Sequence, residues 1–95
     1  MLMSKQHDLL LFRKQQLVRQ LTDCLNLLQG SLHKTPSQRG YHLTTKVDQK
    51  TLTKYVPKDL VPQVRAMTAN HLKVRKLMVR LSDANWRLLQ LPSQD

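Results

Sequence analysis

The sequence predicts a mostly helical α+β fold: a long helix, a β-hairpin and a second long helix, with the two helices packed as an antiparallel coiled-coil-like hairpin. Two observations predict it. Two long segments carry apolar residues at alternating three- and four-residue spacings, the pattern of an amphipathic helix. Between them, a stretch rich in Thr, Val and Tyr is divided by two polar residues, as in a hairpin. With 95 residues, the chain has the size of a single small domain, 1–95.

The first helix is expected over residues 4–29. Ser4 is suited to cap its N-terminus, and Gly30 is suited to end it, because glycine enters the left-handed conformation without strain. The predicted buried row of this helix consists of Leu10, Leu17, Leu21, Cys24 and Leu28. Cys24 is the only cysteine of the chain, so we expect a small buried side chain and no internal disulfide.

Residues 30–40 are expected to form a loop, because Pro36 and Gly40 lie there among polar residues. A hairpin is expected over residues 41–56, with Asp48 and Gln49 as its two-residue turn. In this register the apolar side chains of both strands share one face. The opposite face carries His42, Thr44, Lys46, Thr51, Thr53 and Tyr55.

The last segment is expected to be a turn over residues 57–61 and a helix over residues 62–91. Pro62 fits the first turn of that helix, and Pro92 disfavours helical geometry at the residue before it, so 92–95 form a tail. The predicted buried row consists of Val64, Met67, His71, Val74, Met78, Leu81, Asn85 and Leu88. A flanking apolar stripe, which includes Leu77 and Ala84, would stay partly wet in a monomer. We therefore expect a homodimer or docking on a larger protein.

Positive charge dominates the composition, since 16 Lys and Arg against 6 Asp give a net charge of +10. Nearly opposite the predicted buried row of the second helix, five cations lie within roughly 80° of one another. They are Arg65, Lys73, Lys76, Arg80 and Arg87. Only Asp83 interrupts them, whereas ordinary solvated faces mix both signs. We interpret this stripe as a surface that binds the backbone of nucleic acid, either DNA or structured RNA.

Five further residues are candidates for contact with nucleic acid. The hairpin face that carries His42 and Tyr55 is either a stacking platform with phosphate donors or an ordinary exposed β-face. Arg39 lies in the expected loop, and the hairpin supplies Lys46, Lys50, Lys54 and Tyr55. Phe, Trp and Tyr make up only 4% of the chain, which argues against base stacking as the main contact. The preferred partner is therefore duplex or folded RNA backbone.

The sequence does not indicate an enzyme, a metal-binding protein or a membrane protein. The aspartates are scattered, and neither a Ser-His-Asp order nor a phosphate-binding glycine loop is present, so we expect no enzyme and no small-molecule substrate. His33 and His42 lack a third ligand, so no metal site and no cofactor are expected. The apolar run at residues 9–12 is too short for a signal-peptide core or a membrane span. We expect a cytoplasmic protein, with association with the nucleoid as an option.

The segment after residue 29 carries a recognisable pattern: Gly-Ser-Leu at residues 30–32, a basic loop, Tyr-His-Leu at 41–43, a lysine hairpin and Tyr-Val-Pro-Lys-Asp-Leu-Val at 55–61. With Asn85, Arg87 and Leu88 in the last helix, it resembles a family of small uncharacterised bacterial and archaeal proteins encoded near transposases and other mobile elements. The resemblance covers about the C-terminal two-thirds. It implies an accessory role in a transposase or nuclease system. The family's loop carries several cysteines that look like metal ligands, and residues 33–40 hold none.

A second interpretation is a helical protein-interaction module. Its apolar stripe would dock on a larger nucleic-acid enzyme, as an inhibitor does, and its positive charge would steer it to an acidic surface.

Overall fold

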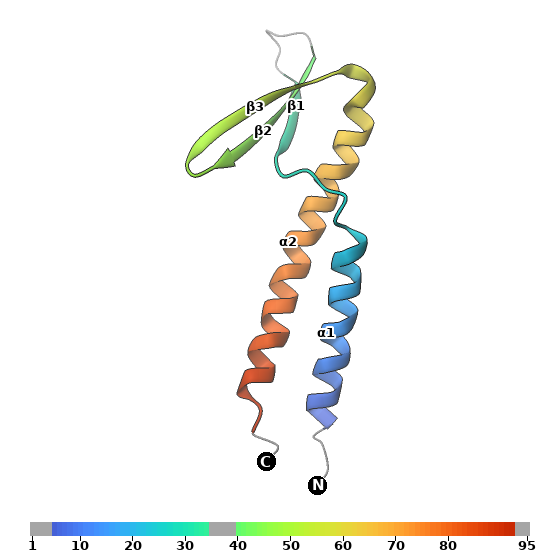
Figure 1. Ribbon diagram of the computed structural model, residues 1–95, viewed down its shortest axis with the longest axis vertical. Helices are drawn as coiled ribbons and strands as arrows, with labels where there is room; N and C mark the ends of the chain where they lie inside the picture. Colours follow the sequence, from blue (N-terminus) through green and yellow to red (C-terminus); the bar gives the residue numbers. More distant parts are fainter. Residues whose placement is uncertain (1–4, 35–39, 93–95) are drawn as a thin grey trace. The chain divides into compact units, whose positions relative to one another are not determined.

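The computed structural model describes residues 5–34 and 40–92 (Figure 1). These residues are mostly helical and contain a three-stranded antiparallel sheet. The elements are, in chain order, α1 (Lys5–Asp23), β1 (Ser31–Lys34), β2 (Tyr41–Val47), β3 (Lys50–Val56), the 3₁₀ helix η1 (Lys58–Leu60) and α2 (Val61–Gln90). The chain divides into two compact units: a helical unit of residues 1–25 and 73–95, and a sheet unit of residues 26–72. The single domain expected from the length stays a prediction.

The helical unit consists of α1 and the C-terminal part of α2, which run in opposite directions (Figure 1). Leu17, Leu77 and Ala84 form its buried cluster, and Leu21, Cys24 and Leu81 pack against this cluster. Cys24 is a free, half-buried thiol. Burial of apolar surface between the two helices therefore holds this unit together.

The first helix ends six residues earlier than predicted, at Asp23 instead of residue 29. Thr22, Asp23 and Cys24 are poor helix formers, because their short polar side chains compete for backbone hydrogen bonds or restrict rotamers. The chain closes the helix with a tighter turn, in which the Cys24 N–H donates to the Leu21 carbonyl at 3.0 Å. Ser4, the predicted N-cap, lies outside the described residues.

The segment after α1 pairs with α2 in place of continuing as a helix. The Leu28 N–H donates to the Met67 carbonyl at 3.1 Å, and the Asn70 Nδ2 donates to the Asn26 carbonyl at 2.8 Å. These tertiary hydrogen bonds replace the helical ones that the sequence pattern suggests. Leu28 accordingly packs in the core of the sheet unit.

Gly30 was predicted to end the first helix. In the structure it lies directly before β1 and lets the backbone approach β2. Its φ is +143°, and a Cβ at this position would lie 2.8 Å from both the Thr44 carbonyl oxygen and the Thr45 Oγ1. The Thr45 hydroxyl also donates to the Gln29 carbonyl at 2.7 Å. A glycine is required here because the backbone passes so close to β2.

The predicted loop over residues 30–40 contains a strand that the sequence did not indicate. β1 pairs antiparallel with β2, from Ser31 opposite Thr44 to Lys34 opposite Tyr41. Leu32 is the only apolar residue of this four-residue strand. The alternation of apolar and polar residues that indicates a strand is therefore too short to recognise. Residues 35–39, which include the candidate Arg39, lie outside the described residues.

The hairpin and its register are confirmed. β2 pairs with β3 from Tyr41 opposite Val56 to Val47 opposite Lys50. The turn residues Asp48 and Gln49 have φ values of 50° and 66°, the left-handed pair that matches the twist of a two-residue hairpin.

The sheet unit buries one face of the sheet against the beginning of α2. Leu43 and Val56 form a buried cluster with Val61 and Val64, and Leu28, Leu32 and Tyr41 pack against it. The short turn from Pro57 is confirmed as η1, and α2 begins at Val61, which places Pro62 in its first turn. The helix ends at Gln90, one residue before the predicted end.

The buried row on the C-terminal part of α2 differs from the predicted one. Met78 is 57% exposed, whereas Leu77 and Ala84 are only 8% and 2% exposed. The observed row runs through Val74, Leu77, Leu81, Ala84 and Leu88. Its centre is rotated by roughly 50° from the predicted centre. The prediction was wrong because both rows have three- and four-residue spacings, and contact with Leu17 of α1 decides between them.

Leu77→Ala and Met78→Ala test this rotation. We expect Leu77→Ala to lower the free energy of unfolding by about 2–4 kcal/mol, because it leaves a cavity beside Ala84. Met78→Ala should change it by about 0.5 kcal/mol, as for other exposed positions. Thermal or urea unfolding followed by circular dichroism measures both values. Equal losses, or a greater loss for Met78→Ala, would contradict the observed row.

Candidate polyanion-binding surface

The rotation of α2 changes where its cations lie. Lys73, Arg80 and Arg87 each directly precede a residue of the observed buried row. Together with Lys76, which precedes Leu77, they therefore lie about 60–120° from the centre of that row, along one side of the helix and not on its back. The four cations thus flank the contact with α1.

Hollows between α1 and α2 confirm this lateral position. Lys73, Lys76 and Arg80 line a hollow of about 280 Å³ with Gln20 and Cys24 of the first segment. A larger hollow of about 580 Å³ has Arg80 and Arg87 on its α2 side. The cations therefore border grooves whose other wall is supplied by α1.

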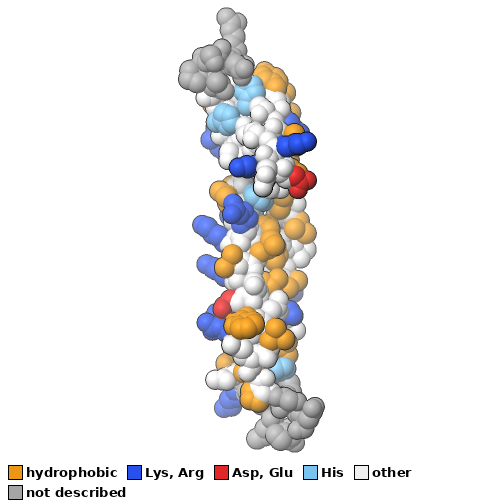
Figure 2. Space-filling view, turned by 90° about the vertical axis from the view of Figure 1, so that its left-hand side faces the viewer, with side chains coloured by type: hydrophobic (Ala, Val, Ile, Leu, Met, Phe, Trp, Pro, Cys, Tyr) orange, Lys and Arg blue, Asp and Glu red, His pale blue; other side chains and the backbone are white. Residues whose placement is uncertain are grey.

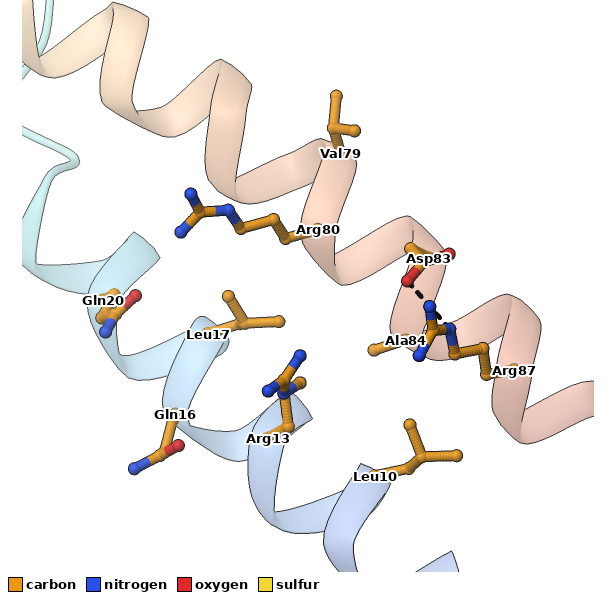
Figure 3. Close-up of a pocket in the computed structure, with 10 residues that line it drawn as sticks. All are labelled: Leu10, Arg13, Gln16, Leu17, Gln20, Val79, Arg80, Asp83, Ala84 and Arg87. Atoms are coloured by element: carbon orange, nitrogen blue, oxygen red, sulfur yellow. Dashed lines mark ion pairs between the residues drawn. The ribbon is translucent and has the colours of Figure 1, made fainter. Parts of the chain in front are cut away.

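Arg13 of α1 joins these cations, although the sequence reasoning did not select it. It lines the larger hollow together with Arg80 and Arg87. In Figure 3 the side chains of Arg13 and Arg80 extend into the space between the helices, close to Leu17. We name Arg13, Lys73, Lys76, Arg80 and Arg87 the basic edge. No sequence signal selects Arg13, because its place beside Arg80 and Arg87 comes from the packing of the two helices.

One carboxylate compensates part of this charge. Asp83 Oδ2 lies 3.1 Å from Arg87 Nε, and both side chains are more than half exposed. Figure 3 shows the pair on the α2 side of the larger hollow. Among the described residues, Arg13, Lys73, Lys76 and Arg80 form no ion pair. A surface ion pair in water contributes little stability, so the Arg87–Asp83 pair is easily exchanged for another anion.

α2 also exposes apolar side chains in the helical unit. Met78, Val79, Trp86 and Leu89 of α2 are all exposed, with Trp86 at 59%. In the lower half of Figure 2, Lys and Arg side chains gather along one border of the visible face, and hydrophobic side chains lie beside them. The helical unit therefore offers two kinds of surface, one cationic and one apolar.

The other candidate residues belong to the sheet unit and fall into three groups. Arg65 is exposed, and its guanidinium carbon lies 6.0 Å from the centre of the Tyr41 ring, a cation–π contact. Lys50 and Lys54 lie on the same side of the sheet as Tyr41, whereas Lys46 and Tyr55 lie on the other side. The four hairpin candidates are exposed but do not share one face.

The described residues offer no obvious centre for other chemistry. Within residues 5–34 and 40–92, no group of three or more His, Cys, Asp or Glu side chains is arranged to hold a metal ion. In the same part of the chain, none of the helices combines the length and the apolar character that a membrane crossing needs.

Comparison with known proteins returned no match to any protein family, to any curated protein or to any solved structure. The resemblance to proteins of mobile elements therefore stays a prediction from the residues that carry it.

Asp83→Asn tests whether the basic edge acts as one anion-binding surface. The change removes the carboxylate that pairs with Arg87 and frees this arginine, so we expect about twofold to fivefold tighter binding to an immobilised polyanion at low salt. Heparin chromatography measures this as elution at a higher salt concentration.

Asp59→Asn in η1 is the matched control, because it changes the net charge equally but lies in the sheet unit. If both variants elute later by the same amount, net charge alone explains the retention and the basic edge has no special part in it.

Proposed function

We propose that this protein binds the sugar-phosphate backbone of nucleic acid through the basic edge. The observation that carries the proposal is the convergence of cations from two helices on the same hollows. Arg13 comes from α1, and Arg80 and Arg87 come from α2. A row of exposed cations, of which only Arg87 forms an ion pair among the described residues, suits a polyanion, because each neutralised phosphate releases condensed counterions.

The geometry favours a backbone contact of low sequence specificity. Lysine and arginine contacts to phosphate position a protein on nucleic acid but do not read bases. Five cations correspond to a slope of about −4 to −5 when the logarithm of the binding constant is plotted against the logarithm of the salt concentration. The net charge of +10 adds long-range steering toward any polyanion.

The coiled-coil packing expected from the sequence forms part of this proposal. On α1 the half-buried and buried positions His7, Leu10, Lys14, Leu17, Leu21 and Cys24 alternate at spacings of three and four. The observed row on α2 has the same spacings, which are those of a coiled-coil seam. In an antiparallel pair of this kind, residues that precede the seam positions of both helices meet on one side. This arrangement would explain why Arg13 accompanies Arg80.

An accessory role in a mobile-element system, without enzyme activity of its own, is the wider biological proposal. It depends on the resemblance of the C-terminal two-thirds. A cytoplasmic location and a choice between DNA and structured RNA belong to the same proposal.

Lys76→Glu combined with Arg80→Glu tests the proposed function. We expect at least a tenfold loss of affinity for a short DNA duplex and for a folded RNA at low salt, because two attractions become repulsions. Fluorescence anisotropy titrations at two salt concentrations measure the affinity and its salt dependence. Both side chains are exposed, so the circular dichroism spectrum should not change.

Arg19→Glu combined with Arg75→Glu supplies the matched control. Both residues are exposed in the helical unit and lie outside the linings of its hollows, and the change in net charge is the same. Equal affinity for the two double variants would mean that net charge, and not the basic edge, governs binding.

A second candidate function is docking on another protein or on a second copy of this chain. The observation that favours it is an apolar side of the helical unit opposite the basic edge. Val18, Leu25 and Met78 are exposed there, and each directly follows a buried or half-buried residue of the contact between α1 and α2. Isolation from lysate with and without nuclease separates the candidates. A protein complex that survives nuclease and high salt favours docking, whereas loss of the bound material favours nucleic acid.

A further inference from the structure

The face of the sheet turned away from the core carries polar side chains and rings. On the core face, Leu32, Leu43 and Val56 pack with the beginning of α2. The register places the opposite set of side chains on one surface: Ser31, His33, His42, Thr44, Lys46, Thr51, Thr53 and Tyr55. This set contains no carboxylate and no aliphatic side chain. We name it the ring face.

Three rings form a continuous row across the three strands of the ring face. His33 of β1 lies opposite His42 of β2, which lies opposite Tyr55 of β3. The ring centres of His33 and His42 are 6.5 Å apart with planes inclined by 29°, and those of His42 and Tyr55 are 5.9 Å apart with planes inclined by 72°. Cross-strand contacts therefore align a ring from every strand.

The rings at the two ends of this row remain accessible. Tyr55 is 62% exposed, and His33 is exposed as well, whereas His42 between them is half-buried. Pairing between strands explains the contacts among the rings but does not cover Tyr55. An exposed aromatic surface of this kind is available for a planar ligand.

The position of the Tyr55 ring is fixed before any ligand arrives. A Cβ on Gly40 would lie 2.8 Å from Tyr55 Cε1, so the ring lies directly against the backbone of this glycine. The ring also contacts His42 edge to face. The hydroxyl of Thr44 lies 3.3 Å from His33 Nε2 and holds the other end of the row. A ring held in this way loses little conformational entropy on binding.

We infer that the ring face is a stacking site for unpaired nucleobases of single-stranded RNA or DNA. The inference rests on the proposed nucleic-acid function and extends it from phosphate contacts to base contacts. Every base presents a flat π-face to a ring once it is unpaired, whereas the bases of a duplex are stacked on one another. Lys46, exposed on the same face, supplies a cation for the connecting phosphate, and the strand residues of the ring face include no carboxylate.

Tyr55→Ala tests the inference, with affinities measured by fluorescence anisotropy for a short oligouridylate, a short oligothymidylate and a short DNA duplex. We expect the variant to bind both single strands about tenfold more weakly and the duplex within about twofold of the unchanged protein. Tyr55→Phe should keep the single-strand affinity, because it keeps the ring. Thr53→Ala, on the same strand and the same face, is the matched control and should bind like the unchanged protein. Weaker binding of either single strand supports the stacking site, and the difference between oligouridylate and oligothymidylate identifies the preferred sugar.

Two further measurements keep the inference testable if Tyr55→Ala disturbs the sheet, as circular dichroism would show. His33→Ala on the edge strand β1 should also weaken single-strand binding selectively. Addition of oligouridylate to the unchanged protein should shift the imidazole proton resonances of His33 and His42 through the ring currents of the bases. Unshifted imidazole resonances, or losses that are equal for single strands and duplex, overturn the inference. If duplex binding still depends on Lys76 and Arg80 in that case, the proposed function stands alone, whereas binding to none of the three probes overturns both.

Discussion

The burial of Leu17 against Leu77 and Ala84 is the interaction on which the surface of the helical unit depends. Ala84 is the most buried of the core side chains, at 2% exposure, so this side of α2 must face α1. Once that side is fixed, the helical repeat sets the direction of every other side chain around the axis of α2. The cations come to flank the contact with α1, and Trp86 and Val79 are left exposed. A rotation of roughly 50° thus determines which side chains a partner meets.

The charge distribution follows from the same constraint. A chain with a net charge of +10 experiences self-repulsion in the folded state, and a polyanion relieves it. In the helical unit, cations from α1 and α2 border the same hollows, where Asp83 is the nearby carboxylate. In the sheet unit, the ring face presents the rings of His and Tyr and the hydroxyls of Ser and Thr, and Lys46 carries its positive charge. Under the proposed function, the first surface contacts phosphates and the second contacts unpaired bases.

The sequence predicted those elements whose signals are local. The hairpin register followed from alternation and a two-residue turn, and Asp48 and Gln49 adopt the left-handed conformations that such a turn needs. Pro57 and Pro62 located the start of α2 to within a residue. The exposure of Lys73, Lys76, Arg80 and Arg87 also followed from helical periodicity.

The sequence could not predict features that depend on tertiary partners. Met78 and Leu77 have similar hydrophobicity, and only contact with α1 shows which of them is buried. After the end of α1, Leu28 hydrogen-bonds to Met67, a partner that local sequence does not reveal. The hairpin register predicted that His42 and Tyr55 share a face. β1 has one apolar residue and forms by pairing with β2, so the addition of His33 to that face could not be predicted. Arg13 was missed for a related reason, since its proximity to Arg80 comes from the packing of two helices.

Lysine acetylation footprinting, read by mass spectrometry, tests the central claim most directly. The claim is that the rotation fixed by Leu77 and Ala84 makes the basic edge the surface that duplex nucleic acid contacts. With a short DNA duplex at low salt, we predict that Lys73 and Lys76 become protected while Lys54 and Lys58 react as in the free protein. Unchanged reactivity of Lys73 and Lys76 in the complex, together with protection at Lys54 or Lys58, would contradict the account.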